Sequence, residues 1–203
     1  MRLGIFGGTF DPVHNLHLFI AESARKLEGL DRVIFVPTNN VHYRNKPSAS
    51  GEQRCEMLQL AIATNERFAL DRSDLEPSAT GYTADLLPRL HERYADDNFV
   101  FVTGADSLAE SSWARFEEVL ESLEAFVIAP RAGIAAGTLS RVVSAVPPAL
   151  RTRIKTLNLP EMPESATLVR TLLAQGKSAR YLVPEPVWEY IMKHQLYAQG
   201  ADA

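Results

Sequence analysis

The feature that most constrains this chain is a glycine-rich polar loop near its beginning, residues 7–18, with the sequence GGTFDPVHNLHL. A short apolar run precedes the loop at residues 3–6 and is typical of a buried strand. The loop leads into residues 19–27, whose apolar side chains recur at the spacing of one helix face. The loop is therefore predicted to be the strand-to-helix turn at the start of a βαβ unit.

The residue types in this loop suit the binding of a phosphate chain. Gly7 and Gly8 would let the backbone approach a ligand closely. Asn15 is the expected N-cap of the helix, and the amide groups that follow it would be donors for an anion. His14 and His17 are three positions apart, so both imidazoles are expected on one face of the helix start. A lone loop histidine is usually an ordinary polar residue, but here the glycines and the histidine spacing occur together.

Apolar runs alternate with helical patterns along the rest of the chain. Five runs are predicted to be strands, at residues 32–37, 68–71, 98–103, 125–129 and 154–159. Ser50 is the expected N-cap of a helix that runs to residue 62. Enzymes with parallel sheets bind ligands beyond the carboxyl ends of the strands, so the loops that follow these runs are candidate binding segments.

Charge and composition narrow the classes of function. The 203 residues carry a net charge of −4, which argues against nonspecific binding to nucleic acid or to an anionic membrane. Cys55 is the only cysteine, so no internal disulfide can form. No apolar run reaches membrane-spanning length, and no signal peptide is apparent. We therefore expect a soluble, cytoplasmic protein whose phosphate binding depends on a local site.

Residues 7–17, GGTFDPVHNLH, resemble the GGTFDPVHxGH signature of the nucleotidylyltransferases, and most closely that of the bacterial nicotinate-mononucleotide adenylyltransferases. The resemblance extends from Leu3 to Tyr197. It implies an α/β fold with a Rossmann-like open parallel sheet and helices on both faces, in one domain over residues 1–203 with a small C-terminal helical part. Leu16 stands where the signature has glycine, and its side chain is expected to narrow the ATP site.

Residues 164–170, ESATLVR, have the features of a second phosphate cradle. Ser165 would cap a helix, Thr167 adds a hydroxyl to its first turn, and Arg170 lies on the face of Thr167. The segment is similar to the family's Ile-Ser-x-Thr-x-Ile-Arg, with Glu164 in place of the first isoleucine. It is expected to hold the β- and γ-phosphates of ATP.

The strand predicted at residues 98–103 ends in Gly104-Ala105-Asp106-Ser107-Leu108, which matches a motif of the same family. A carboxylate at a strand end can accept hydrogen bonds from ribose hydroxyls. The expected role of Asp106 is therefore a ligand contact, and the alternative is that it caps the helix that follows.

The resemblance also implies where the mononucleotide binds. In the family, the backbone of the segment that matches Tyr82 and Thr83 recognises the pyridine carboxylate, and a tryptophan that matches Trp113 stacks on the nicotinate ring. Without the resemblance, Thr83 would be a helix N-cap, Asp85 would complement the helix dipole, and Trp113 would be a core residue. The other expected contacts are Asn39, His42, Lys46 and Arg131. For His42 and Lys46 a solvated loop position is an equally good interpretation.

The predicted reaction is adenylyl transfer from ATP to nicotinate mononucleotide, which gives deamido-NAD and pyrophosphate. The expected catalytic residues are His14, His17 and Arg170. The expected ATP-binding residues are Gly7, Gly8, Thr9, Phe10, His14, His17, Gly104, Asp106, Ser165, Thr167 and Arg170. Mg²⁺ is expected as a cofactor held mainly by the ATP phosphates, because the sequence offers no carboxylate cluster for it.

Two alternative functions stay open. The chain fits a related nucleotidylyltransferase with another acceptor, such as phosphopantetheine, and a nucleotide-binding protein of the same fold whose activity is lost through Leu16. A dehydrogenase is excluded because residues 4–8, GIFGG, do not form G-x-G-x-x-G and the second strand ends in Pro37-Thr38 without an acidic residue. The sequence leaves open the oligomeric state, a homodimer included, and the choice between nicotinate and nicotinamide mononucleotide.

Overall fold

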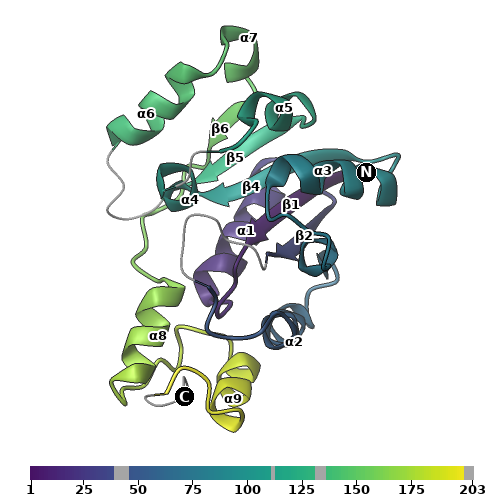
Figure 1. Ribbon diagram of the computed structural model, residues 1–203. Coiled ribbons are helices and arrows are strands. Elements are labelled where there is room, and N and C mark those ends of the chain that lie inside the picture. The colour runs from purple at the N-terminus through teal and green to yellow at the C-terminus, as the bar shows by residue number, and fades with distance from the viewer. Residues whose placement is uncertain (39–45, 111–112, 131–135, 199–203) are drawn as a thin grey trace.

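Six parallel strands form one sheet in the order β3-β2-β1-β4-β5-β6 (Figure 1). The computed structural model describes residues 1–38, 46–110, 113–130 and 136–198. The strands are β1 (Arg2–Gly8), β2 (Arg32–Pro37), β3 (Phe68–Leu70), β4 (Asn98–Gly104), β5 (Ala125–Ala129) and β6 (Ile154–Thr156). The six predicted strands are confirmed, although β6 ends at Thr156, before the predicted residue 159.

Helices cover both faces of the sheet, as predicted, because alternate strand residues are buried in two separate apolar clusters. One cluster joins the sheet to α1 (Asn15–Leu27), α2 (Gly51–Ile62), α8 (Ala166–Ala174) and α9 (Glu185–Lys193). The other joins it to α3 (Thr83–Arg93), α4 (Ala105–Glu110), α5 (Phe116–Glu121), α6 (Ala136–Ala145) and α7 (Pro148–Arg151). A short 3₁₀ helix, η1 (Ser73–Leu75), follows β3. None of the helices in the described ranges has the length and apolar character of a membrane span.

The strand order reverses between β1 and β4, which pair in parallel with Phe6 opposite Val102. This order is that of the doubly wound nucleotide-binding sheets, in which ligands bind where the order reverses, beyond the carboxyl ends of the strands. Gly8 and Gly104 mark those two ends. The loops that follow β1 and β4 are therefore candidate ligand-binding segments.

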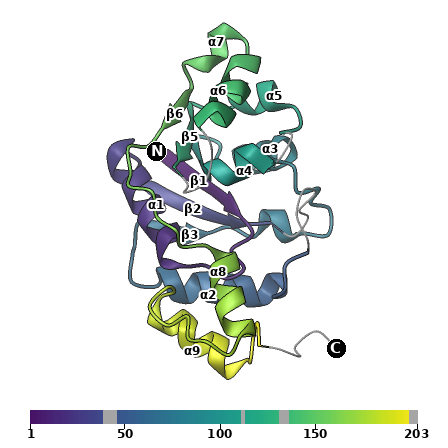
Figure 2. The ribbon, with the colours of Figure 1, turned by 90° about the vertical axis from the view of Figure 1, so that its left-hand side faces the viewer.

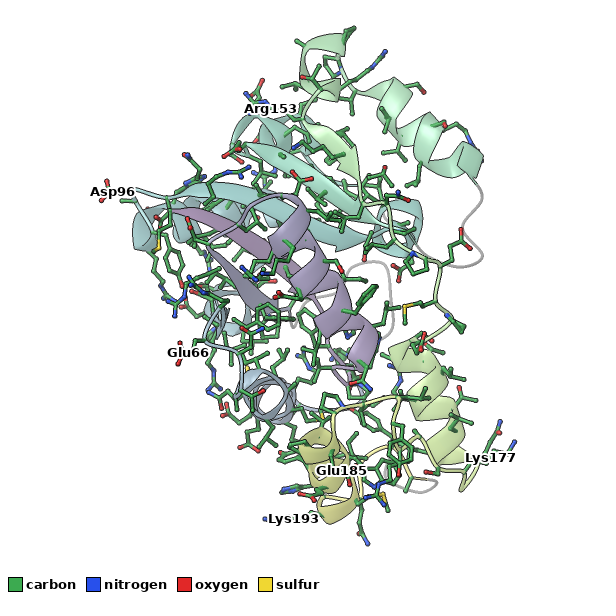
Figure 3. All side chains as sticks on the ribbon, turned by 180° about the vertical axis from the view of Figure 1, so that it is seen from behind. Glu66, Asp96, Arg153, Lys177, Glu185 and Lys193 are labelled. Carbon is green, nitrogen blue, oxygen red and sulfur yellow. The ribbon has the colours of Figure 1, made fainter. Side chains whose placement is uncertain are left out.

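The C-terminal helical part, α8 and α9 with the turn between them, packs at the end of the sheet beside α2 and the start of α1 (Figures 1 and 2). The Asn15 backbone amide donates to the Leu182 carbonyl at 2.9 Å, and the Asn15 side chain donates to the Tyr181 carbonyl at 2.7 Å. The exposed side chains of Lys177 and Lys193 lie on the outer side of this part (Figure 3). The hydrogen bonds of Asn15 thus hold the turn between α8 and α9 against the start of α1.

Asp71, just after β3, is a buried carboxylate that ties this edge of the sheet together. One of its oxygens accepts the Ser73 amide at 2.8 Å, and the other accepts Arg93 at 2.9 Å and the Tyr94 hydroxyl at 3.0 Å. Burial acts to raise the pKa of Asp71, but the hydrogen bonds from Ser73, Arg93 and Tyr94 outweigh it and hold the pKa below its ordinary value. The ionised form is therefore the one that stabilises the fold.

Replacing Asp71 with Asn should lower the free energy of unfolding at pH 7 by about 2 kcal/mol, because charge-assisted hydrogen bonds are lost. The pKa of Asp71 is lower in the folded state, so its contribution is present above about pH 4 and is lost as the pH falls through the folded-state value. Urea unfolding across this pH range measures the effect. Asp96→Asn, at an exposed position (Figure 3), is the control and should change little. A difference that stays constant down to pH 3 would contradict the charged role.

Candidate active site

The two segments predicted to bind phosphate, which are far apart in the sequence, contact each other in the structure. Arg170 Nη1 donates to the Asp11 carbonyl oxygen at 2.6 Å, and Arg170 Nη2 donates to the Thr167 hydroxyl at 3.3 Å. Ser165 accepts the Leu168 amide at 3.0 Å, which confirms its predicted role as the N-cap of α8. The α8 cap and the loop after β1 therefore lie together near the carboxyl end of that strand.

His14, and not Asn15 as predicted, is the N-cap of α1. Asn15 is instead the first helical residue, and its side chain donates to the Tyr181 carbonyl in the turn between α8 and α9. The His14 amide donates to Nδ1 of His17 at 3.1 Å, so a neutral His17 carries its hydrogen on Nε2, the nitrogen that can donate to a phosphate oxygen. The two imidazole rings are stacked, with centroids 3.6 Å apart and planes 26° from parallel. The expected pairing of the histidines at the helix start is confirmed.

Gly7 and Gly8 are the last two residues of β1, where the loop was predicted to begin, and they are closely packed, a reason for glycine that differs from the predicted ligand approach. A Cβ atom on Gly7 would lie 3.0 Å from the Phe101 ring, and one on Gly8 would lie 3.1 Å from the Phe10 ring. Phe10 is only 1% exposed and adopts a left-handed backbone conformation, with φ of 50°. Its ring packs edge-on against His17, with centroids 5.0 Å apart. Phe10 therefore supports the His17 ring. Because the Phe10 side chain is buried, only the Phe10 main chain could contact ATP.

Leu16 lies in the hydrophobic core and does not line an open site. Its side chain is 3% exposed and belongs to the apolar cluster that includes Ile20 of α1 and Val187 of α9. The prediction that Leu16 narrows the ATP site assumed that the side chain at this position of the signature faces the ligand. The helix start instead directs this side chain into the cluster that holds the C-terminal part against the sheet.

Gly104 and Asp106 lie together at the carboxyl end of β4. Asp106 is in the first turn of α4, and its half-buried carboxylate folds back over Gly104, where a Cβ atom would collide with it. This position next to the strand-order reversal is compatible with both the ribose contact and the helix-end role considered for Asp106.

The segment that begins α3 differs in one detail from its sequence interpretation. Tyr82 is the N-cap residue, so Thr83 is the first helical residue and not the cap. The Thr80 hydroxyl accepts the Tyr82 amide at 3.3 Å and donates to Asp85 at 2.6 Å. Thr80, followed by Arg115, lowers the pKa of Asp85 through these hydrogen bonds. Tyr82 is 37% exposed, which leaves its side chain accessible to a ligand.

Trp113 packs in an aromatic cluster on the α3–α5 side of the sheet. Its ring meets Phe101 and Phe126 edge-on, with centroid distances of 5.7 and 5.0 Å, and its Nε1 donates to the Ser107 carbonyl at 3.3 Å. The indole is partly buried, so the core interpretation accounts for its packing, and stacking on a pyridine ring stays a prediction.

Lys46 is exposed. The predicted contacts Asn39, His42 and Arg131 lie outside the described residues.

Arg54 is the main site-supporting residue that the sequence interpretation missed. It is fully buried, and Nη1 donates to the Thr9 and Thr38 carbonyls at 2.6 and 2.8 Å, while Nε donates to the Ala49 carbonyl at 3.3 Å. Burial lowers the pKa of Arg54, and the negative charge of Asp11 opposes that shift. The sequence did contain one indication of this burial: Arg54 lies on the same face of α2 as the buried Leu58.

Within the described ranges, no group of three or more His, Cys, Asp or Glu side chains could hold a metal ion. The two segments predicted to bind phosphate meet at the strand-order reversal of a parallel sheet. This arrangement defines an α/β protein of the doubly wound class, a class in which nucleotides commonly bind at this place.

Comparison with known proteins gives the family. Residues 5–172 match the cytidylyltransferase-like family, and the chain belongs to it. A protein of Rubrobacter xylanophilus named probable nicotinate-nucleotide adenylyltransferase is 38% identical over 99% of this chain and 94% of its own length. One of Symbiobacterium thermophilum with the same name is 34% identical over 98% and 96%. A solved structure, the Plasmodium falciparum nicotinic acid mononucleotide adenylyltransferase complexed with NaAD, shares the fold, with a TM-score of 0.74, 22% identity and 97% of both chains covered.

Replacing Leu16 with Gly should destabilise the protein by about 3 kcal/mol, because a core side chain is deleted and a glycine enters the helix start. Urea unfolding measures the loss, and calorimetric titration with ATP measures whether the site opens. Leu27→Gly, at an exposed position on the same helix, should lose no more than about 1 kcal/mol. Tighter ATP binding by Leu16→Gly at unchanged stability would show that Leu16 does narrow the site.

Proposed function

We propose that the protein transfers the adenylyl group of ATP to nicotinate mononucleotide, with deamido-NAD and pyrophosphate as products. The observation that carries the proposal is the contact of Arg170 with the Asp11 carbonyl, which joins a second phosphate cradle to the histidine loop. The relatives named as nicotinate-nucleotide adenylyltransferases, with which this chain aligns over almost its whole length, support this acceptor.

In the proposed reaction, a phosphate oxygen of nicotinate mononucleotide attacks the α-phosphorus of ATP. The bond from that phosphorus to the β-phosphate bridging oxygen breaks, and pyrophosphate leaves with the electron pair. No covalent intermediate with the protein is needed, so the work of the chain is to position two anions and to stabilise the developing charge. His14 and His17 would contact the phosphates at the reacting centre, with His17 donating through Nε2.

The second cradle would hold the leaving group. The amide groups at the start of α8 present a partial positive charge, and the Arg170 guanidinium adds a full one beside them. Thr167 is exposed in the first turn of the same helix and offers its hydroxyl. This set can bind the β- and γ-phosphates before the reaction and stabilise pyrophosphate as it forms.

Mg²⁺ fits this site as an ion carried mainly by the phosphates. The described residues offer no carboxylate cage, and Mg²⁺ in phosphate-transfer sites is commonly held by substrate phosphates, water and one or two carboxylates. When bound, the ion would neutralise charge on the phosphate chain. Asp106 would contact a ribose at the end of β4, and Tyr82, Thr83 and Trp113 would surround the pyridine ring.

The proposal is tested by pyrophosphate release from Mg-ATP with nicotinate mononucleotide, nicotinamide mononucleotide or phosphopantetheine as the acceptor. We expect turnover with the mononucleotides, fastest with nicotinate mononucleotide, and none with phosphopantetheine. Formation of deamido-NAD, followed by chromatography, confirms that the adenylyl group has been transferred. Release only with phosphopantetheine would assign another acceptor, and ATP binding without release would leave a nucleotide-binding protein.

Replacing His17 with Ala should lower kcat by about 10²- to 10⁴-fold, because a donor to the reacting phosphate is removed. His194→Ala, at an exposed histidine after α9, is the matched control and should keep wild-type turnover. Thermal unfolding of both variants separates catalysis from folding. Near-normal turnover by a folded His17→Ala chain would remove the catalytic role of His17.

A further inference from the structure

The Asp11 carboxylate, one residue before Pro12 in the first loop, is buried and accepts hydrogen bonds from two other segments of the chain. Oδ2 accepts the Ser48 amide at 2.7 Å, and Oδ1 accepts the Ala49 amide at 3.0 Å. Oδ1 also accepts the hydroxyl of Tyr197 at 2.8 Å, from the chain that follows α9. Asp11 is only 4% exposed, so these donors replace the solvent that would otherwise stabilise its charge.

Arg170 lies beside this carboxylate, but its short contact is with the main-chain carbonyl of Asp11. Nη1 is 2.6 Å from the Asp11 carbonyl oxygen and 3.9 Å from the carboxylate oxygen Oδ2. A guanidinium prefers a paired contact with a carboxylate when both are accessible to each other. The donors already bound to the Asp11 carboxylate compete with Arg170 for it, so the ion pair between the two side chains stays long, at 3.9 Å, and the short contact of the guanidinium is with the Asp11 carbonyl.

Tyr197 is a buried donor with an unusual backbone. Its side chain is 8% exposed, and its φ of 64° is in the left-handed region that disfavours a residue with a bulky side chain. Burial, followed by the negative charge of Asp11, raises the pKa of Tyr197, so the phenol stays protonated and can donate. Nothing in the proposed reaction uses this hydroxyl directly.

We propose that Tyr197 is a positioning residue for phosphate binding. Its hydroxyl binds Oδ1 and fixes the orientation of the Asp11 carboxylate, so that the ion pair between Oδ2 and Arg170 stays long and the Arg170 guanidinium, bound to the Asp11 carbonyl, can still bind the polyphosphate of ATP. The inference deepens the proposed function and rests on it, because it concerns the arginine that would hold pyrophosphate. It makes the C-terminal segment part of the ATP site without any contact between Tyr197 and the substrate.

The test compares Tyr197→Phe with a matched variant, Tyr190→Phe. Tyr190 lies on α9 and donates its hydroxyl to Glu56, so it too is a C-terminal tyrosine bound to a carboxylate, but Asp11 does not take part. Calorimetric titration with Mg-ATP, without an acceptor, gives the Kd of each chain. Loss of the Tyr197 hydroxyl should raise the ATP Kd about tenfold, the scale of one hydrogen bond to a charged group. The Kd for nicotinate mononucleotide and both values for Tyr190→Phe should stay within about twofold of wild type.

Arg170→Ala separates positioning from simple destabilisation. In that background Tyr197→Phe should cause no further loss of ATP affinity, because the group through which Tyr197 acts is absent. A full additional tenfold loss there would overturn the inference, as would an unchanged ATP Kd in Tyr197→Phe alone. Equal weakening of both substrates would assign Tyr197 a structural role only.

A second variant keeps the test decisive if the Tyr197→Phe protein does not fold. 4-Aminophenylalanine at position 197 keeps a weaker donor to Asp11, and it should give an ATP Kd between those of the tyrosine and phenylalanine chains. If the phenylalanine chain does not fold, a Kd equal to wild type in the amino variant overturns the inference. A wild type that binds ATP without releasing pyrophosphate overturns only the proposed reaction, and one that binds no ATP overturns both.

Discussion

The structure of the site depends on one buried carboxylate, that of Asp11. Because a buried charge must be matched by hydrogen-bond donors, the segment before α2 and Tyr197 at the end of the chain are drawn to it. The carbonyl of the same residue receives Arg170 from α8. A single residue of the first loop thus contacts the segment before α2, helix α8 and the chain after α9, and its carbonyl holds the Arg170 guanidinium in place.

Arg54 performs the complementary task with the opposite charge. Its buried guanidinium donates to carbonyl oxygens of the segments after β1 and β2 and of the chain before α2. Asp11 and Arg54 therefore fix one loop through its side-chain and main-chain acceptors. This rigidity matters for phosphate chemistry, in which positioning and preorganised charge supply most of the rate enhancement.

An acidic protein can bind polyanions when its positive groups are local and oriented. The chain has a net charge of −4, but the site combines the starts of α1 and α8 with Arg170 at the reversal of strand order. The remaining charge on the surface is screened within about 10 Å at ordinary ionic strength. In the proposed function, attraction of the substrate phosphates is thus a property of this site and not of the molecule as a whole.

The strands, the turn after β1 and the Ser165 cap could be predicted from the sequence, because apolar periodicity and capping are local properties of neighbouring residues. The sequence also named Arg170, but not its partner, because a contact across 159 positions has no local signal. The position of Leu16 in the core became evident from the packing of the folded chain. This packing likewise showed that Phe10 supports His17 and that Arg54 and Tyr197 hold the loop. Burial and the satisfaction of buried polar groups are settled by the whole packed chain, and no short stretch of residues encodes them.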